Sequence, residues 1–151
     1  MKNKISLVFL ILTTAQAPAQ ENIEGNDTLP PPQIVSGESA DLNEYLWKNR
    51  PLIVFSDTPE DPRYIQQMAY ITDRFDALSE RDVVVLTDTN PAAKSPLRTK
   101  LRPRGFMLIL IGKDGIKYLR KPFPWNVREI TRTIDKLPAR QQEIRDGLNG
   151  G

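Results

Sequence analysis

The loop FSDTPEDPRY, residues 55–64, holds the side chains of this chain that are best suited to chemistry. It follows the apolar run LIVF and precedes an amphipathic stretch, so it joins an expected strand to an expected helix. In α/β proteins, polar residues at such a junction often form the active site. Asp57 and Asp61 could serve as an acid/base pair or hold a hard cation such as calcium, with Thr58 and Arg63 as further candidate binding residues.

The same residues also meet the ordinary requirements for starting a helix. Thr58 could be the N-cap with Pro59 as the first helical residue, or Asp61 could be the N-cap before Pro62. Carboxylates at this place favour the positive end of the helix dipole. The loop lacks the glycine and the alternating ligands of a calcium loop, so the sequence predicts no metal and no cofactor. Capping alone and catalysis both stay open as interpretations.

The composition removes several kinds of chemistry. The chain of 151 residues contains neither Cys nor His. Without a thiol it cannot exchange disulfides or reduce peroxides through a cysteine. Without an imidazole it cannot build a Ser-His or Cys-His catalytic pair, and thiolate and imidazole metal sites are excluded for the same reason.

Charge is unevenly distributed along the chain. Residues 20–93 carry 14 acidic and five basic side chains, whereas residues 94–121 carry nine basic side chains and one acidic. The two parts could face and neutralise each other, or the basic part could bind an anionic partner. Arg104 precedes an expected strand and could face the carboxylate-rich loop, and Lys113 lies in an expected hairpin turn. Both are therefore candidate binding residues.

The first residues, 1–19, have the features of a secretory signal peptide. Lys2 and Lys4 give a positive start, before an apolar run that is too short to span a bilayer, and Ala17 and Ala19 form a small-x-small cleavage site. Cleavage predicts a secreted protein, periplasmic or extracellular, with no membrane anchor. Since the lost segment carries two lysines, the mature chain has 19 basic and 19 acidic residues, and this zero net charge gives no reason to expect nucleic acid binding.

Three further segments follow the signal peptide. Residues 20–35 are polar and contain three consecutive prolines, which is typical of an extended linker. Residues 36–144 carry the periodic apolar patterns of a folded domain. Residues 145–151 form a polar tail that is expected to be flexible.

The apolar patterns within the domain predict an α/β fold. Strands are expected at Leu52–Phe55, Val83–Leu86, Phe106–Ile111 and residues 116–120, and helices from Asp41, over Pro62–Leu78 and from Asn126. The first two strands flank a helix and should be parallel, whereas the last two form a hairpin. Short connections then give a four-stranded mixed sheet of order 2-1-3-4, with the first strand central and helices on both faces. Trp47 and Trp125 flank helices and are expected to pack against the domain.

Four segments, in this order, resemble a family of secreted bacterial thioredoxin-like proteins of unknown function: YLWKNRPLIVFS, ERDVVVL, LIGKDGIKYLRKP and IDKLPARQQEI. That family is similar to the DUDES modules of vertebrate extracellular proteins. The resemblance covers roughly residues 40–144, and it implies a thioredoxin-like fold in a secreted setting but no particular reaction. In active thioredoxins the loop after the central strand carries Cys-x-x-Cys, whereas here that place holds SDTPEDPR.

The sequence therefore favours a secreted, cysteine-free, thioredoxin-like domain that binds an unknown protein or an anionic polysaccharide and does not catalyse a reaction. Two alternatives stay open. One is a hydrolase-type enzyme that uses Asp57, Asp61 and Arg104, and the other is a polyanion-binding module that uses the basic hairpin.

Overall fold

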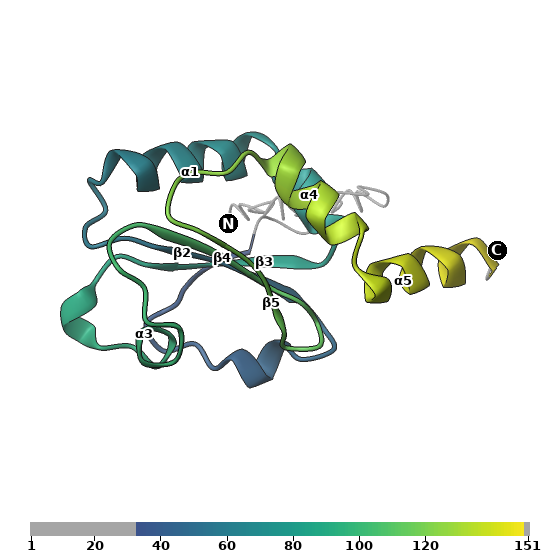
Figure 1. Ribbon diagram of the computed structural model, residues 1–151, viewed down its shortest axis with the longest axis horizontal. Helices are drawn as coiled ribbons and strands as arrows, with labels where there is room; N and C mark the ends of the chain where they lie inside the picture. The colour runs from purple at the N-terminus through teal and green to yellow at the C-terminus, as the bar shows by residue number, and fades with distance from the viewer. Residues whose placement is uncertain (1–32, 150–151) are drawn as a thin grey trace, which may run out of the picture.

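The computed structural model describes residues 33–149, which form one mixed sheet with helices on both faces (Figure 1). The strands are β1 (Ile34–Ser36), β2 (Arg50–Phe55), β3 (Val83–Asp88), β4 (Met107–Ile111) and β5 (Lys117–Lys121). The helical elements are the 3-10 turns η1 (Leu42–Tyr45) and η2 (Pro91–Ala93), and the helices α1 (Pro62–Asp73), α2 (Phe75–Ser79), α3 (Pro96–Leu101), α4 (Val127–Asp135) and α5 (Pro138–Asn149). The predicted signal peptide and most of the predicted linker lie outside the described residues.

The strand β2 is the centre of the sheet, as the sequence predicted. It pairs in parallel with β3 and antiparallel with β4, in a sheet of order β1-β3-β2-β4-β5. All six residues of β2 are buried, because neighbouring strands cover its edges and helical elements cover both faces. The strands β4 and β5 form the expected antiparallel hairpin.

The sheet has five strands, so the prediction of four was wrong. The additional strand, β1, pairs in parallel with the outer edge of β3. Two of its residues, Ile34 and Val35, belong to the segment that the sequence predicted as linker, residues 20–35. Three residues are too few to show an alternating pattern, and all three are exposed, so no periodic signal marked them as a strand.

The two faces of the sheet are covered unequally. On one face, β2 side chains such as Val54 pack under α1, α2 and α4. On the other face, Ile53 and Phe55 pack beside Leu42 of η1 and Leu97 of α3. Figure 1 shows α1 and α4 on one side of the sheet and α3 on the other. Because η1 has four residues and α3 has six, against 12 in α1, this second face is thinly covered.

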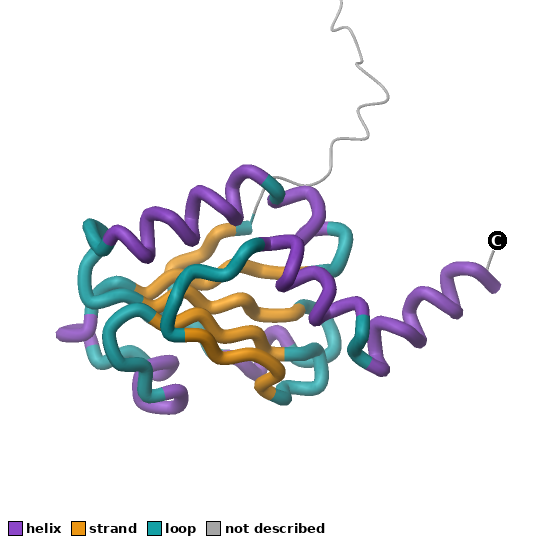
Figure 2. The backbone as a smooth tube through the Cα atoms, turned by 45° about the horizontal axis from the view of Figure 1, so that its top comes forward, coloured by secondary structure: helices purple, strands orange, loops and turns teal. Residues whose placement is uncertain are grey.

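Two helical segments differ from the sequence prediction. The helix expected over residues 62–78 is divided into α1 and α2 at Arg74, whose backbone leaves the helical region with φ −132° and ψ 39°. The tail predicted from residue 145 lies within α5 as far as Asn149. Pro138, a residue favoured at the first helical position, begins α5, and Figure 2 shows this helix projecting away from the rest of the domain.

Candidate functional site

The carboxylate-rich loop between β2 and α1 builds the start of α1. Asp61 is the N-cap, since its Oδ1 accepts the backbone N–H of Arg63 at 2.9 Å, and Pro62 is the first helical residue. The Arg63 guanidinium also donates to both carboxylate oxygens of Asp61, at 3.1 and 2.7 Å. These hydrogen bonds from Arg63 lower the pKa of Asp61, so this carboxyl group is a poor proton donor at neutral pH.

The other polar residues of the loop also have local partners or none. The Thr58 hydroxyl donates to the Glu60 carboxylate, and this hydrogen bond lowers the pKa of Glu60. Ser56 donates its hydroxyl to the backbone carbonyl of Thr58 at 2.5 Å. Asp57 is exposed, and no residue of the described chain forms an ion pair with it. The contacts of the loop are those of a helix start.

The arginine that lies with the capping carboxylate is Arg63 and not Arg104. The Arg63 guanidinium carbon lies over the ring of Phe106, 5.8 Å from its centroid, in a cation–π contact. Arg104 is exposed and forms no ion pair within residues 33–149. The structure therefore does not bring Arg104 together with Asp57 and Asp61 in an ion pair.

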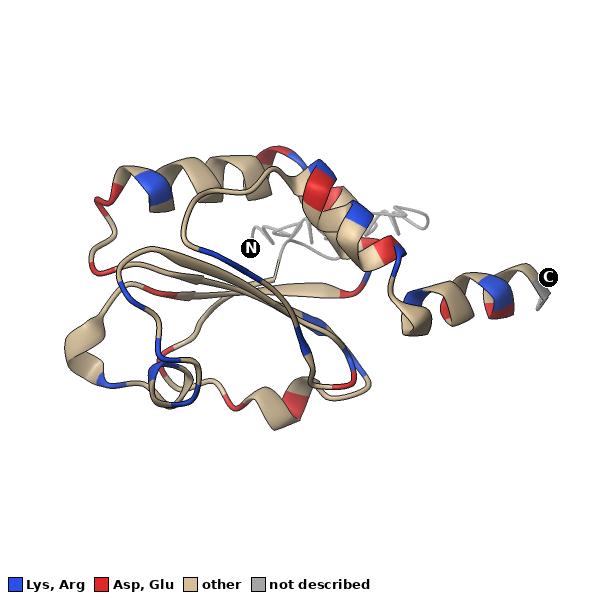
Figure 3. Ribbon diagram, viewed as in Figure 1, with Lys and Arg blue, Asp and Glu red and all other residues tan. Residues whose placement is uncertain are grey.

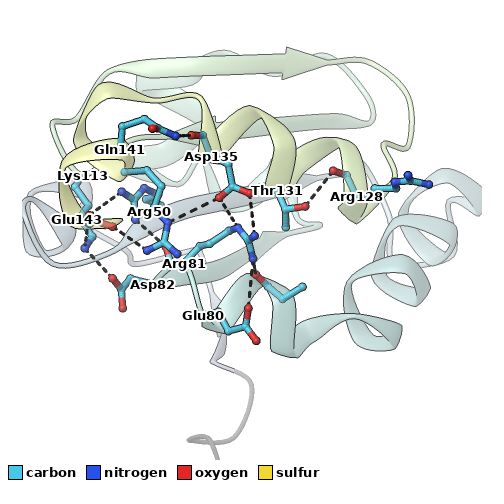
Figure 4. A network of polar contacts seen from close by, with 12 residues as sticks. Arg50, Glu80, Arg81, Asp82, Lys113, Arg128, Thr131, Asp135, Gln141 and Glu143 are labelled. Atoms are coloured by element: carbon cyan, nitrogen blue, oxygen red, sulfur yellow. Dashed lines mark hydrogen bonds and ion pairs between the residues drawn. The ribbon is translucent and has the colours of Figure 1, made fainter. Parts of the chain in front are cut away.

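Lys113 belongs to a network of ion pairs at the start of β2 (Figure 4). Its Nζ lies 2.8 Å from Asp82 Oδ2 and 2.9 Å from Glu143 Oε1. Glu143, on α5, also accepts a hydrogen bond of 2.8 Å from Arg50, the fully buried first residue of β2. Burial alone would raise the pKa of Glu143, but hydrogen bonds from Arg50, Lys113 and Arg140 outweigh it and lower the pKa to about 2. Lys113 thus fastens the β4–β5 turn to α5.

A second buried network, which the sequence did not reveal, fixes α3. The fully buried side chain of Asp88, at the end of β3, accepts hydrogen bonds from Ser95 Oγ at 2.5 Å and from Arg98 Nε at 2.9 Å. Arg98 also donates to the backbone carbonyl of Ser56 at 2.6 Å. Because α3 is held against the ends of β2 and β3, the position of Lys100 within it is set. In the sequence, the position of Asp88 at the end of an apolar strand could have marked it as a candidate site residue. Its pairing with Ser95 and Arg98 is visible only in the fold.

A hollow of about 350 Å³ lies on the thinly covered face of the sheet, between η1, the end of α3 and the β4–β5 turn. Its apolar and aromatic lining residues are Leu42, Tyr45, Leu46, Pro51, Leu101 and Ile111. Gly115 helps to keep it open. With φ of 79° its backbone favours glycine, and a Cβ there would lie 3.0 Å from Leu46 Cδ2. The volume falls within the usual range of ligand pockets.

A second hollow of about 350 Å³ adjoins the first, and the two share Leu42 and Lys100. We name the combined depression the η1–α3 groove. Lys100 on α3 and Lys117 on β5 border it; both are exposed, and neither forms an ion pair within the described part of the chain. The carboxylate of Asp41 lines the second hollow and caps η1, because it accepts the N–H of Asn43 at 2.9 Å. Figure 3 shows Lys and Arg gathering at α3 and the loop after it.

Trp47 departs from the packing that the sequence predicted. The residue is 74% exposed, and its backbone lies in the left-handed region with φ 62°, which is uncommon for a bulky residue. The backbone N–H of Trp47 donates to the backbone carbonyl of Lys113 at 2.8 Å, and this hydrogen bond joins the segment after η1 to the β4–β5 turn. Trp47 is the residue next to Leu46, which lines the groove. Trp125 packs against the core, as expected.

Two further kinds of site were sought over residues 33–149. No group of three Asp or Glu side chains there could hold a metal ion. Nor does any helix in that range combine the length and the apolar character that crossing a bilayer requires.

Comparison with known proteins identifies relatives of the chain. A family model described as Domain of unknown function (DUF4174) matches residues 41–143. No curated protein matches the chain. Among solved structures, Prx1a of Plasmodium yoelii, modified at its N-terminus, is similar over 68% of this chain and 81% of its own, with 17% identity and a TM-score of 0.52. The reduced 2-Cys peroxiredoxin of Plasmodium vivax is similar over 70% of this chain and 85% of its own, with 16% identity and a TM-score of 0.53.

At these identities the likeness shows the fold alone. The chain has an α/β fold with a mixed sheet, similar to the thioredoxin fold of peroxiredoxins. The likeness carries no thiol chemistry with it, because the chain has no cysteine.

Substitution of Asp61 distinguishes a helix cap from a reactive group. Asp61→Asn should leave the free energy of unfolding nearly unchanged, and Asp61→Ala should lower it by about 1 kcal/mol, because asparagine keeps an oxygen that accepts the Arg63 N–H. Denaturant titrations measure this, with Asp57→Ala as the exposed control. If calcium raised the melting temperature of the wild type but of neither Asp61 variant, the loop would be a metal site instead.

Acid should weaken the fold through Glu143. Because its pKa is lowered from 4.5 to about 2, the charged carboxylate stabilises the folded state above about pH 4.5, and this contribution is lost as the pH falls toward about 2. Glu143→Gln should lower the free energy of unfolding at pH 7 by about 2 kcal/mol, after allowance for solvent screening, and should flatten its pH dependence below about pH 5. Denaturant titrations across this pH range measure both effects.

A surface ion pair provides the matched control. Glu129→Gln removes an exposed pair with Arg132, whose charged atoms are 2.9 Å apart. It should change the free energy of unfolding by less than about 0.5 kcal/mol. Equal losses in the Glu129 and Glu143 variants would contradict the role of the buried network.

Proposed function

Because the chain belongs to the DUF4174 family, a domain of unknown function, we propose a function from its own geometry. The protein is a secreted, non-catalytic binding module, and its η1–α3 groove holds an extended, acidic segment of a partner protein. The observation that carries the proposal is the groove itself, an apolar depression bordered by two lysines that form no ion pair within the described residues.

The lining of the groove favours a ligand that is both apolar and negatively charged. Leu42, Leu46 and Leu101 offer contacts for aliphatic or proline side chains, whose burial contributes about 25 cal/mol per Å² of apolar surface removed from water. Lys100 and Lys117 offer partners for carboxylates at the rim, where charge acts mainly on specificity and association rate. Two adjoining hollows suit an extended chain that places successive side chains in each.

The carboxylate-rich loop supports binding over catalysis. Asp61 is engaged by the N–H and the guanidinium of Arg63. Its lowered pKa makes it unsuited to general-acid work near neutral pH. Arg104 forms no ion pair within residues 33–149. A hydrolase that uses Asp57, Asp61 and Arg104 is therefore the less favoured alternative.

The proposed secretion rests on the N-terminal sequence. Residues 1–19 have the charged start, the apolar centre and the small-x-small end of a signal peptide, and they lie outside the described residues. The resemblance to secreted thioredoxin-like proteins and to the DUDES modules supports the same periplasmic or extracellular setting.

An NMR titration tests the groove. The chain from Gln20 onward, labelled with nitrogen-15, is titrated with a synthetic hexapeptide, acetylated Asp-Leu-Pro-Pro-Leu-Asp amide. The amide signals of Leu46 and Gly115 should shift, with a dissociation constant on the order of 0.1 mM. In the groove variant, Lys100→Glu/Lys117→Glu, binding should weaken by about tenfold or more, because the acidic ends of the peptide lose their partners.

Two controls separate binding in the groove from general attraction. Lys94→Glu/Lys136→Glu, the control variant, makes the same change in net charge at exposed residues outside the groove and should bind like the wild type. A peptide with serine in place of both leucines should bind at least several-fold more weakly, because it lacks the apolar contacts. Equal weakening in both double variants, or shifts spread evenly over the surface, would contradict the proposed site.

A second candidate function is binding of an acidic polysaccharide. Within the basic segment, residues 94–121, the exposed basic residues that form no ion pair with the described part of the chain are Lys94, Lys100, Arg102, Arg104 and Lys117. Part of the basic segment is therefore uncompensated, although the mature chain expected from the sequence has zero net charge. Exposed charges act within about 8 Å at physiological salt, so a local patch can bind where the whole molecule is neutral.

Heparin chromatography against a salt gradient measures this second activity. The chain from Gln20 onward should be retained at low salt, and Lys100→Glu/Arg102→Glu should elute earlier, because counterion release scales with the number of cations engaged. Elution of the wild type in the void volume at low salt would remove the polysaccharide from consideration.

A further inference from the structure

We propose that residues 20–32 of the same chain dock in the η1–α3 groove and compete there with the partner. This inference rests on the proposed function, because it names a second occupant of the same site. The segment has the chemistry that the groove favours. Its charged residues are all acidic: Glu21, Glu24 and Asp27. Its larger apolar residues are Ile23, Leu29 and Pro30–Pro32.

The chain enters the sheet at the end where the groove lies. The backbone carbonyl of Gln33 accepts the N–H of Val85 at 3.0 Å, immediately before β1 begins. The registers of β1, β3, β2 and β4 place Gln33 at the level of Pro51 and Ile111. Both of these strand residues line the groove. Residues 20–32 therefore join the domain at the level of the sheet that the groove occupies.

The segment is long enough to reach the groove. Strand β1 lies two positions from β2 and three from β4, which is about 10–15 Å at the usual spacing of about 4.8 Å between strands. The 13 residues of the segment, in an extended or polyproline conformation, span about 40 Å. The segment can pass the ends of β3 and β2 and still lay its acidic part along Lys117 and Lys100.

Tethering makes a weak contact effective. A short flexible tether gives an effective concentration of about 1 mM. If the free segment binds the groove with a dissociation constant on the order of 0.1 mM, the tethered segment would fill the groove about nine-tenths of the time and weaken the apparent affinity for a partner about tenfold. A partner must then displace the segment, which makes binding depend on a stronger ligand or on removal of the segment.

A single engineered cysteine tests the docking, because the chain has no other cysteine. A nitroxide attached at Asn26→Cys, in the chain from Gln20 onward, should broaden the amide signals of Gly115 and of residue 117. This broadening should be lost in the groove variant Lys100→Glu/Lys117→Glu, in which the acidic segment meets two carboxylates in place of two lysines.

A charge swap and the control variant make the outcome decisive. The groove variant combined with Glu21→Lys/Glu24→Lys/Asp27→Lys should recover the broadening, because the reversed charges attract again. The control variant Lys94→Glu/Lys136→Glu should retain it. Broadening that is absent from the wild type, or that the groove substitutions leave unchanged, would overturn the proposal.

The hexapeptide separates this inference from the proposed function. Glu21→Gln/Glu24→Gln/Asp27→Gln should tighten binding of the hexapeptide about tenfold, because the competing segment is neutral. Equal, groove-dependent binding to the wild type and to this neutralised chain would overturn the docking of the segment and leave the proposed function intact. Failure of the hexapeptide to bind the neutralised chain would overturn the proposed function, while groove-dependent broadening would still support docking.

Discussion

The complete burial of β2 is the constraint on which the rest of the structure depends. Its six residues are buried along the whole strand, and the first of them carries a charge. A guanidinium that is removed from water is costly unless it is paired and hydrogen-bonded. Arg50 meets most of this requirement, because its two terminal nitrogens donate to the carbonyl of Arg81 and to the carboxylate of Glu143, each at 2.8 Å, while its buried Nε has no partner within the described residues. One strand therefore determines where the loop before β3 and the helix α5 must lie.

The unequal cover of the two sheet faces explains where the candidate site lies. The connection from β2 to β3 supplies a helix of 12 residues and another of five, whereas η1 and α3 supply four and six residues to the opposite face. The shorter elements leave a depression over Pro51 and Ile111. In this cysteine-free chain, the loop at the carboxyl end of β2 starts a helix, and the apolar depression bordered by Lys100 and Lys117 lies toward the amino end of the same strand.

The sequence predicted features that depend on local pattern and failed on those that depend on distant contacts. The apolar runs and short connections were sufficient for the order of four strands and for the central place of β2. Asp61 before Pro62 is a local capping pattern, and it forms the cap. The exposure of Trp47 could not be foreseen, because its left-handed backbone accompanies a hydrogen bond to Lys113, 66 residues further along the chain. The groove was equally hidden, since its walls come from three separate segments.

The pairing of Arg50 with Glu143 also bears on the order of events as the chain is made. The two residues are 93 positions apart. At a synthesis rate of about 5–20 residues per second, Glu143 is made about 5–20 s after Arg50. During that interval a closed core would hold a buried cation without its carboxylate partner, which disfavours complete folding of the emerging polypeptide. If the chain is secreted as proposed, such a delay would favour a form that can still be threaded through a translocation channel.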